Sequence, residues 1–399
     1  MNVFLLTSVP ITPPWDQGDK NLAYTLATAL PDIQFQVLST KNGLQADAAN
    51  VAAQALYTSR RPGLRDKARV FAWLFSNRLL DELTFFRESL GLVPAAEARQ
   101  IADQGPDLYH LIYRPFRLSS WFFKLLPEFR RRPTIHTIPA TADGLPLNRD
   151  LFFADRLVAL SEYGVQALQQ LGLRNVVHIP PGIQIQDWEN LCPQTETYKA
   201  ELGLSGRPVL LFPGHYGPGQ GADTIVEALP HLLQAVPDAC LIFACRIRSS
   251  ADALREQQVR QAIGRMGLEH AVRFYQTVKD MQPLIGASDV VLLPLSSMRD
   301  KVDIPTTLLE SMAAGKPIVI SDIPPMNELI RGKLARQGPA GLLAPAGEAL
   351  ELARATISLL QKPSLRMQMG ARGQQLVRGH FDIQRVAQQY ASLYQEVLD

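Results

Sequence analysis

Short apolar runs alternate with longer segments of helical periodicity along most of the chain. The clearest example is the stretch 290–322, VVLLPLSSMRDKVDIPTTLLESMAAGKPIVISD. Its first apolar run is closed by Pro294 and has the size of a buried parallel strand. Pro305 opens a segment whose apolar residues share one helical face, and Gly315 ends that segment before a second apolar run at 318–320. The stretch therefore predicts strand, loop, helix and strand.

The same alternation extends to both ends of the chain. In the first part we expect a helix over 20–30, a helical region over 58–90, and strands at 2–8, 34–38, 107–113, 134–138, 156–160 and 176–180. In the second part we expect strands at 209–212, 239–244, 272–275, 290–293, 318–320 and 341–343, separated or followed by helices at 222–235, 251–266, 280–287, 305–314, 348–361, 364–378 and 382–398. The polar segment 179–199 reads as a linker. Strands that alternate with helices in both parts predict two α/β domains with parallel sheets.

Length and composition narrow the class of protein. At 399 residues the chain is longer than one ordinary core, so two domains are expected. Its 46% hydrophobic and 20% charged residues are ordinary for a globular protein, and a net charge of +2 gives no support to a nucleic-acid partner. No apolar run approaches the roughly 20 residues of a membrane span. The segment 1–15 reads as a first strand and not as a signal peptide, so a cytoplasmic protein is expected.

Two basic stretches leave membrane contact open. Arginines are frequent over 58–90, and 114–132 combines arginines with Trp121 and Phe122. Such clusters can dock on an anionic membrane surface. The alternative is that they form helices that pack by their apolar faces and keep their charges in solvent.

The loop PGHYGPGQGAD at 213–223 follows a predicted strand and opens a helix. Its backbone N–H groups, with the helix N-terminus, could cradle a phosphate. Gly214 and Gly219 have the spacing of a Walker A loop, but Gln220 stands where that loop requires lysine. Three cysteines are too few and badly spaced for a zinc or disulfide framework, and we expect no metal site. The loop predicts anion binding without naming a nucleotide fold.

Four further positions are candidates for ligand contact, each with a plain structural alternative. Asp303 and Glu310 supply hydroxyl acceptors near the start of the 305–314 helix, although Glu310 could be an ordinary solvated helix residue. His136 is expected at the end of a strand on the side that binds ligands, although a single histidine is usually structural. Gly18 could let a phosphate or sugar approach the backbone, or it could be a turn glycine.

Several segments together resemble the retaining glycosyltransferases of family 4, which have the GT-B architecture. They are ALSEYGVQALQQLGLRNVVHIPPGIQIQDW, FPGHYGPGQGADTIVEALPHLLQAVPDACLIF, ASDVVLLP with TLLESMAAGKPIVISD, and the closing FDIQRVAQQYASLYQEVL. The resemblance implies two Rossmann-like parallel-sheet domains that face each other across a cleft. Residues 1–180 would form the acceptor-side domain, 181–380 the domain that binds the nucleotide sugar, and 381–399 a C-terminal helix that packs back on the first domain.

The resemblance also assigns roles to positions of this sequence. Glu310 matches the second of two motif glutamates, which accepts hydrogen bonds from ribose hydroxyls, and the first glutamate falls on Val302. The arginine and lysine that the family places on the diphosphate fall on His215 and Gln220. Gly18 matches the first-domain glycine that faces the diphosphate. His136 matches a histidine on the acceptor and sugar side.

The two absent cations require replacements if the chain is active, because one preorganised donor is worth about 3 kcal/mol of transition-state stabilisation. Candidates are Arg246, Arg248, Arg299 and Lys301, and a protonated His215. Asp303 or Lys301 could replace the first glutamate. The first helical turn, with Pro305, Thr306 and Thr307, would place backbone N–H groups on the leaving diphosphate.

The expected protein is thus a retaining, metal-independent hexosyltransferase without a cofactor. Its partners would be a nucleotide-diphosphate sugar and a glycan or lipid-linked acceptor, with peripheral contact at the inner membrane face left open and no nucleic acid. A second reading is a GT-B scaffold that has lost catalysis and binds a ligand or a partner subunit. A third is a GT-B phosphorylase or sugar-nucleotide epimerase.

Overall fold

A computed structural model describes residues 1–7, 18–39, 50–55, 106–115, 120, 124, 131–142, 147–247, 249–276, 278, 280–299 and 301–399. The chain divides into two compact units. The first contains Met1–Thr141, Leu145–Gly182 and Ile383–Asp399, and the second contains Ile183–Asp382 with Ala142–Gly144. The helical region predicted over 58–90, most of the basic stretch 114–132 and Arg248 lie outside the described residues.

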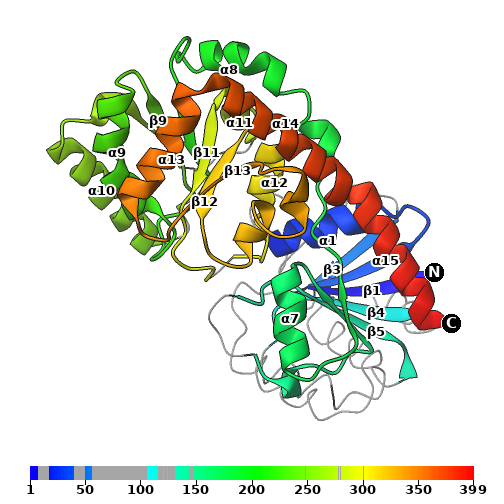
Figure 1. Ribbon diagram of the computed structural model, residues 1–399. Helices are drawn as coiled ribbons and strands as arrows, with labels where there is room; N and C mark the ends of the chain where they lie inside the picture. Colours follow the sequence, from blue (N-terminus) through cyan, green and yellow to red (C-terminus); the bar gives the residue numbers. More distant parts are fainter. Residues whose placement is uncertain are drawn as a thin grey trace. The chain divides into compact units, whose positions relative to one another are not determined.

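The first unit is built on a parallel sheet. Its elements are β1 (Asn2–Thr7), α1 (Gly18–Thr28), β2 (Gln34–Ser39), β3 (Val51–Ala55), β4 (Leu108–Ile112), β5 (Thr134–Ile138), β6 (Arg156–Ala159), α7 (Glu162–Gln170), β7 (Val176–His178) and α15 (Ile383–Leu398). Among the described residues the strand order is β3-β2-β1-β4-β5-β6-β7. The first unit is therefore completed by the last helix of the chain, whose Val386, Tyr390 and Tyr394 join its core (Figure 1).

The second unit has its own parallel sheet. Its elements are α8 (Thr195–Glu201), β8 (Val209–Phe212), α9 (Ala222–Ala235), β9 (Cys240–Ala244), α10 (Ser250–Arg265), β10 (Val272–Tyr275), α11 (Gln282–Ala287), β11 (Val290–Leu293), α12 (Thr306–Ala313), β12 (Ile318–Ser321), β13 (Gly341–Ala344), α13 (Ala349–Gln361) and α14 (Pro363–His380). The strand order over the described residues is β10-β9-β8-β11-β12-β13. The four central strands β8, β9, β11 and β12 are buried on both faces, as expected for a parallel sheet covered by helices on both sides (Figure 1). The edge strand β10 is half-buried to exposed.

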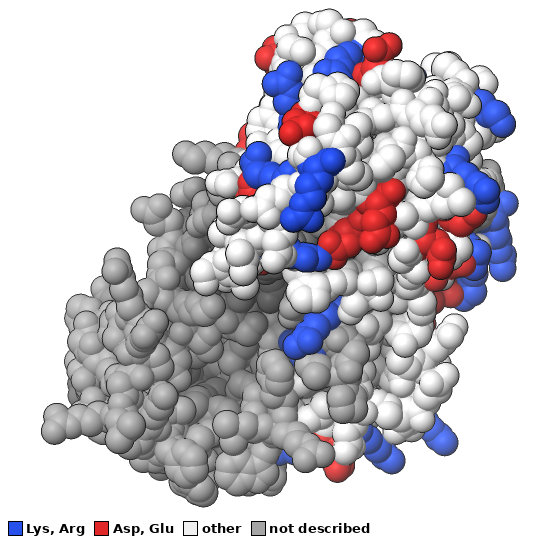
Figure 2. Space-filling view, turned by 90° about the vertical axis from the view of Figure 1, so that its left-hand side faces the viewer, with Lys and Arg blue, Asp and Glu red and all other residues white. Residues whose placement is uncertain are grey.

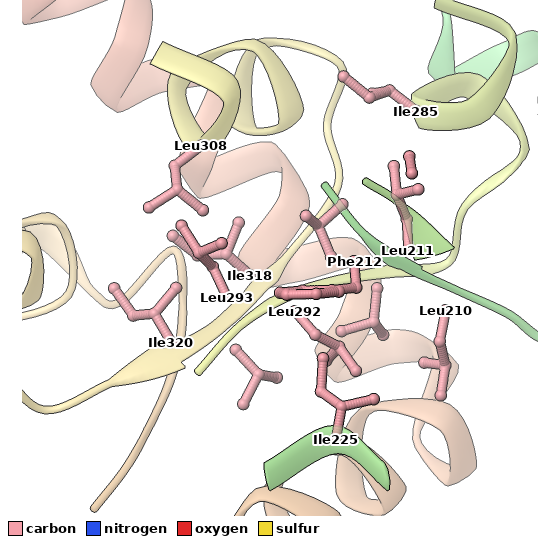
Figure 3. Packing of buried hydrophobic residues seen from close by; sticks show 14 of the residues in the cluster. Leu210, Leu211, Phe212, Ile225, Ile285, Leu292, Leu293, Leu308, Ile318 and Ile320 are labelled. Carbon is pink, nitrogen blue, oxygen red and sulfur yellow. The ribbon is translucent and has the colours of Figure 1, made fainter. Parts of the chain in front are cut away.

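The core of the second unit lies between the sheet and these two helical layers. Figure 3 shows Leu308 of α12 on one side of the strands and Ile225 of α9 on the other, with Phe212, Leu292 and neighbouring strand residues between them. Phe212 and Leu308 are fully buried. This packing fixes both helices that begin at the carboxyl edge of the sheet.

The structure corrects two sequence predictions. The strand β3 was not predicted, because its sequence VAAQA lacks an apolar run. The linker predicted over 179–199 is wrong from Thr195 onward, where α8 begins. The Lys199 ammonium is buried in this helix, 2.9 Å from an Asp289 carboxylate oxygen and 3.2 Å from one of Glu196. The polar composition of the segment therefore came from paired charges and not from a solvated linker.

Within the described residues, none of the helices combines the length and the apolar character that a bilayer crossing requires. Figure 2 shows one face of the molecule, on which blue and red side chains lie among one another over the described part. That distribution agrees with a chain of 40 basic and 38 acidic residues.

Candidate functional site

The carboxyl edge of the second sheet has a switch point between β8 and β11. From β8 the chain proceeds outward to β9 and β10, then returns to β11 on the other side of β8. Open parallel sheets bind ligands at such a point, because the loops of the two central strands diverge there. The two loops are 213–221, which we call the glycine loop, and 294–305, which leads into α12.

The backbone of the glycine loop lies against the backbone of the 294–305 loop. The Gly219 carbonyl oxygen accepts hydrogen bonds from the N–H groups of Ser296 at 2.9 Å and Ser297 at 3.3 Å. Gly221 has a φ of 94°, and a Cβ there would lie 2.8 Å from the Pro294 carbonyl oxygen. Only glycine fits such a position, so this part of the loop serves a close approach between the two loops.

His215 lies in the glycine loop with 9% of its surface exposed. Its Nδ1 accepts a hydrogen bond from the Gly217 N–H at 3.1 Å. An accepting Nδ1 carries no proton, so the neutral ring holds its proton on Nε2. Protonation to the cation expected as a replacement charge would break this bond, and His215 is suited to donate from Nε2 as a neutral group.

Gln220 does not face the ligand side as a free donor. Its side-chain Nε2 donates to the carbonyl oxygens of Arg299 at 3.1 Å and Ser297 at 3.4 Å. The side chain is 2% exposed, and its Oε1 has no hydrogen-bond partner in the described structure. The expectation that Gln220 contacts the diphosphate therefore does not fit, because both donors of its amide are directed at the other loop.

The helix α12 presents its N-terminus to the switch point. Pro305 is its N-cap and offers no side-chain hydrogen bond to the first turn, and that turn contains no acidic residue. The N–H groups of a first helical turn lack partners within the helix, so they attract negative charge. Thr306 and Thr307 are half-buried in this turn. Asp303 is buried just before it, and Val302 is half-buried beside Asp303.

Glu310 is half-buried one turn into α12. Burial raises the pKa of its carboxyl from 4.5 to about 7, and a hydrogen bond with the Thr306 side chain partly opposes that rise. A carboxylate that burial has partly stripped of water has lone pairs to offer to ligand hydroxyls. The structure therefore brings together Thr306 and Glu310, two of the residues predicted for donor binding.

Two of the predicted replacement cations, Arg246 and Lys301, lie in the loops that follow β9 and β11 at this edge. Burial raises the pKa of the Cys245 thiol to about 12, and the charge of Lys301 is among the influences that oppose the rise. Lys301 is therefore close to Cys245, whose neighbour Arg246 follows β9. Both cations are half-buried, whereas the Arg299 side chain is exposed. Gly214 also lies beside Cys245, because its backbone forms a hydrogen bond with the Cys245 thiol.

In the first unit His136 is a buried residue in the middle of β5, not at its end as predicted. Its Nε2 lies 3.0 Å from the Tyr113 carbonyl oxygen, and its ring stacks on Tyr113 with centroids 4.7 Å apart. Nε2 therefore donates, and burial lowers the pKa of His136 to about 4, so the ring is neutral. Its Nδ1 has no hydrogen-bond partner among the described residues. Gly18 begins α1, after a loop outside the described residues.

The sequence analysis missed a buried polar network in the first unit. Nδ1 of His110 in β4 lies 2.7 Å from the Tyr394 hydroxyl, and Nε2 lies 2.8 Å from the Thr137 hydroxyl. Thr137 also lies 3.0 Å from the Tyr390 hydroxyl. The network joins β4 and β5 to α15. The two tyrosines four residues apart in the closing helix were the only signal of it in the sequence.

No group of three or more potential metal ligands occurs in the described part of the chain. The chemistry that the edge offers is thus that of half-buried cations, helix N–H groups and the carboxyl groups of Asp303 and Glu310. Such a set suits a ligand that carries both phosphate and hydroxyl groups.

Residues 207–362 match the sequence profile of the family Glycosyl transferases group 1. This match lies within the second unit, which is therefore similar to the glycosyltransferases of group 1. A curated relative, the phosphatidyl-myo-inositol mannosyltransferase of Mycobacterium leprae, is 30% identical over 56% of this chain and 54% of its own. The α-D-kanosaminyltransferase of Streptomyces kanamyceticus is 26% identical over 51% and 50%. The chain thus spans about half the length of the curated relatives it matches.

Solved structures extend the likeness to the whole fold of the chain. Anabaena HepE in complex with UDP has a TM-score of 0.72 at 18% identity and covers 99% of this chain and 100% of its own. Sucrose-phosphate synthase from Thermosynechococcus elongatus has a TM-score of 0.73 at 18% identity and covers 100% and 99%. At such identities the likeness shows the fold alone. The GT-B fold expected from the resemblance is confirmed, and the family profile supports the resemblance over residues 207–362.

Proposed function

We propose that the protein transfers a hexose from a nucleotide-diphosphate sugar to an acceptor hydroxyl, with retention of anomeric configuration. The observation that carries the proposal is the pairing of Glu310 with the uncapped N-terminus of α12 at the switch point of the second sheet. A nucleotide sugar has hydroxyl groups for the first and phosphates for the second.

The diphosphate would be held by neutral and charged donors together. The first-turn N–H groups of α12, at Thr306 and Thr307, supply a positive dipole end, and Lys301 and Arg246 supply full charges. The Nε2–H of His215 would add a neutral donor from the glycine loop. Removal of one such preorganised donor typically costs about 3 kcal/mol of transition-state stabilisation, so the set can replace the two cations that the family usually has.

In the proposed reaction the bond between the sugar C1 and its diphosphate oxygen breaks, and a bond from the acceptor oxygen to C1 forms on the same face. The acceptor proton passes to a diphosphate oxygen, and the products are a glycoside and a nucleoside diphosphate. Negative charge grows on the leaving diphosphate, where the α12 dipole and the cations stabilise it. Glu310 would accept hydrogen bonds from the ribose hydroxyls, and Asp303 would take the place of the first motif glutamate.

We assign acceptor recognition to the first unit, with His136 on its sugar side. The neutral ring keeps one lone pair, on Nδ1, that could accept a hydroxyl hydrogen. The relatives are named for unlike acceptors: phosphatidyl-myo-inositol in one case and L-malate in another. The proposal therefore covers two classes of acceptor, glycan and lipid-linked. Contact with an anionic membrane surface is expected for the lipid-linked class.

The test starts from donor binding. Titration calorimetry and thermal melting with UDP-, GDP- and ADP-sugars would be run on the wild type and on Glu310→Ala. The series begins with UDP-glucose, because the structural neighbour HepE of Anabaena forms a complex with it. At about 100 times its dissociation constant, a ligand should stabilise the fold by about 2.7 kcal/mol. A donor that binds the wild type and fails with Glu310→Ala supports the proposal. Formation of an inverted product would refute the retaining reaction.

A second function is favoured by three positions. Val302, His215 and Gln220 stand where the resemblance places a glutamate and two cations, and Gln220 is directed at a neighbouring loop. A scaffold without catalysis that binds a ligand or a partner subunit would have this composition. Donor binding in these assays, with neither hydrolysis nor transfer of the sugar in a turnover assay, would select this function. Phosphate-dependent turnover or epimerisation would select the phosphorylase or epimerase reading.

A further inference from the structure

We infer that Gln220 is a positioning residue that fastens the loop before α12 to the glycine loop through a neutral amide. The functional importance of this contact rests on the proposed function, because the α12 N-terminus is the proposed diphosphate site. Its evidence is independent of any reaction. It gives position 220 a role other than phosphate contact.

The contact joins two loops that are far apart in sequence. Nε2 of Gln220 donates to the carbonyls of Arg299 and Ser297, which are 79 and 77 residues further along the chain. Two backbone hydrogen bonds, from Ser296 and Ser297 to the Gly219 carbonyl, lie directly beside it. The amide is thus the side-chain part of a small patch of four hydrogen bonds between the loops.

The orientation of the amide is fixed by its partners. Both partners are carbonyl oxygens, which accept and cannot donate, so the NH₂ group and not Oε1 must face them. The donors are enclosed, because the Gln220 side chain is 2% exposed. A carbonyl pair that lost these donors without gaining water would remain buried and unsatisfied.

The fastened segment leads to the proposed diphosphate site. Arg299 is followed by Lys301, Asp303 and the α12 cap Pro305 within six residues. The far end of α12 is held in a similar manner, because Nε2 of Gln374 donates to the Ala313 carbonyl at 3.0 Å and the Glu189 carbonyl at 3.4 Å. One glutamine amide therefore secures the approach to α12 and another secures its end.

Three substitutions separate this role from the alternatives. Gln220→Met keeps the length and removes both donors. Gln220→Lys supplies up to three donors to the same carbonyls, so it should restore the fastening. Gln220→Glu brings a carboxylate against two carbonyl oxygens, and only its protonated form can donate. If Gln220 only fills space, or if only its lack of charge matters, Gln220→Met should behave like the wild type.

The experiment measures amide hydrogen exchange by mass spectrometry on the full chain without ligand, with each variant compared to wild type at the same pH. We expect Gln220→Met to speed exchange in the 294–303 segment about tenfold, while Gln220→Lys stays within about twofold of wild type. Gln220→Glu should resemble Met at pH 8 and approach wild type at pH 5. The control Gln374→Met makes the same chemical change at the other end of α12 and should leave the 294–303 segment within about twofold.

The inference is overturned if Gln220→Met leaves the 294–303 segment within about twofold of wild type, or if Gln374→Met speeds that segment equally. If Gln220→Met does not fold, the other two variants decide. The inference is then overturned if Gln220→Lys speeds exchange in the 294–303 segment by more than about twofold, or if exchange in Gln220→Glu relative to wild type is the same at pH 5 and pH 8. Because no nucleotide is present, a failure of donor binding would count against the proposed function and leave this result standing. If a donor binds but the exchange result fails, the proposed transferase stands and the positioning role of Gln220 is ruled out.

Discussion

Glu310 allows a quantitative test, because its carboxyl titrates far from its ordinary range. The perturbation is Glu310→Gln, which keeps the shape and removes the titration. The pKa of Glu310 rises from 4.5 to about 7 in the folded protein. A tenfold change in a protonation constant is worth about 1.4 kcal/mol, so this rise corresponds to about 3 kcal/mol.

The sign follows from proton counting. Between pH 4.5 and 7 the folded protein holds a proton on Glu310 that the unfolded chain has released, so the unfolding free energy falls as pH rises. The contribution of the carboxyl is fully present below pH 4.5 and is lost above pH 7. The Gln variant has no such loss, so its stability relative to wild type should improve by about 3 kcal/mol between pH 4.5 and 8.

The assay is thermal melting of both proteins at pH 4.5 and pH 8 without ligand. For a unit of roughly 200 residues, 3 kcal/mol corresponds to about 6–12 °C in Tm. We expect the difference in Tm between variant and wild type to be larger by that amount at pH 8. A difference that stays constant within about 2 °C would refute the reasoning, because it would mean that Glu310 is an ordinary solvated carboxylate.

Ligand binding should respond to pH in the opposite direction. If Glu310 accepts hydrogen bonds as a carboxylate, a bound nucleotide must displace its proton below pH 7. The affinity of the wild type for UDP should then fall by up to tenfold for each pH unit below 7. Affinity that is flat between pH 5 and 8 would exclude an ionised acceptor at this position.

Three further results are expected. Burial lowers the pKa of Lys316 to about 8, so its charged form destabilises the fold. The unfolding free energy should therefore rise by about 3 kcal/mol from pH 8 to 10.5. In urea unfolding, Lys316→Met should abolish that rise. Tyr394→Phe leaves the buried His110 of β4 without one hydrogen-bond partner and should lower the unfolding free energy by about 1–3 kcal/mol in the same assay. Lys301→Ala and Arg246→Ala should each weaken UDP binding about tenfold by calorimetry, and unchanged affinity in both would remove them from the site.

Much of the fold could be predicted because its signals are local. The apolar run 290–293 and the helical face after Pro305 correspond to β11 and α12. The strand β3 escaped prediction because its five residues contain one β-branched side chain, and its place is decided by pairing with β2. Residues 195–199 looked like linker because the charge of Lys199 is neutralised by Asp289, which lies 90 residues away.

The candidate site was less predictable, because side-chain direction depends on distant backbone. The spacing of the glycine loop indicated that position 220 opens a helix, but the two carbonyls that take its amide come from the loop after β11. The pattern at 134–138 placed His136 in a strand, but at its end and not in its middle, and its burial depends on Tyr113 and on other aromatic rings around it. The shifted pKa of Glu310 likewise has no signal in the sequence, since it comes from the packing of α12.

The place of α15 in the first unit has a consequence for the order of synthesis. On the ribosome, the strands β1–β7 emerge before Ile183–Asp382, and the helix that joins their buried network emerges only after it. At about 5–20 residues per second, synthesis of these roughly 200 intervening residues takes on the order of 10–40 s. During that time the first unit lacks Val386, Tyr390 and Tyr394, which complete its core in the folded protein. The growing chain therefore exposes apolar surface of the first unit that the finished unit buries.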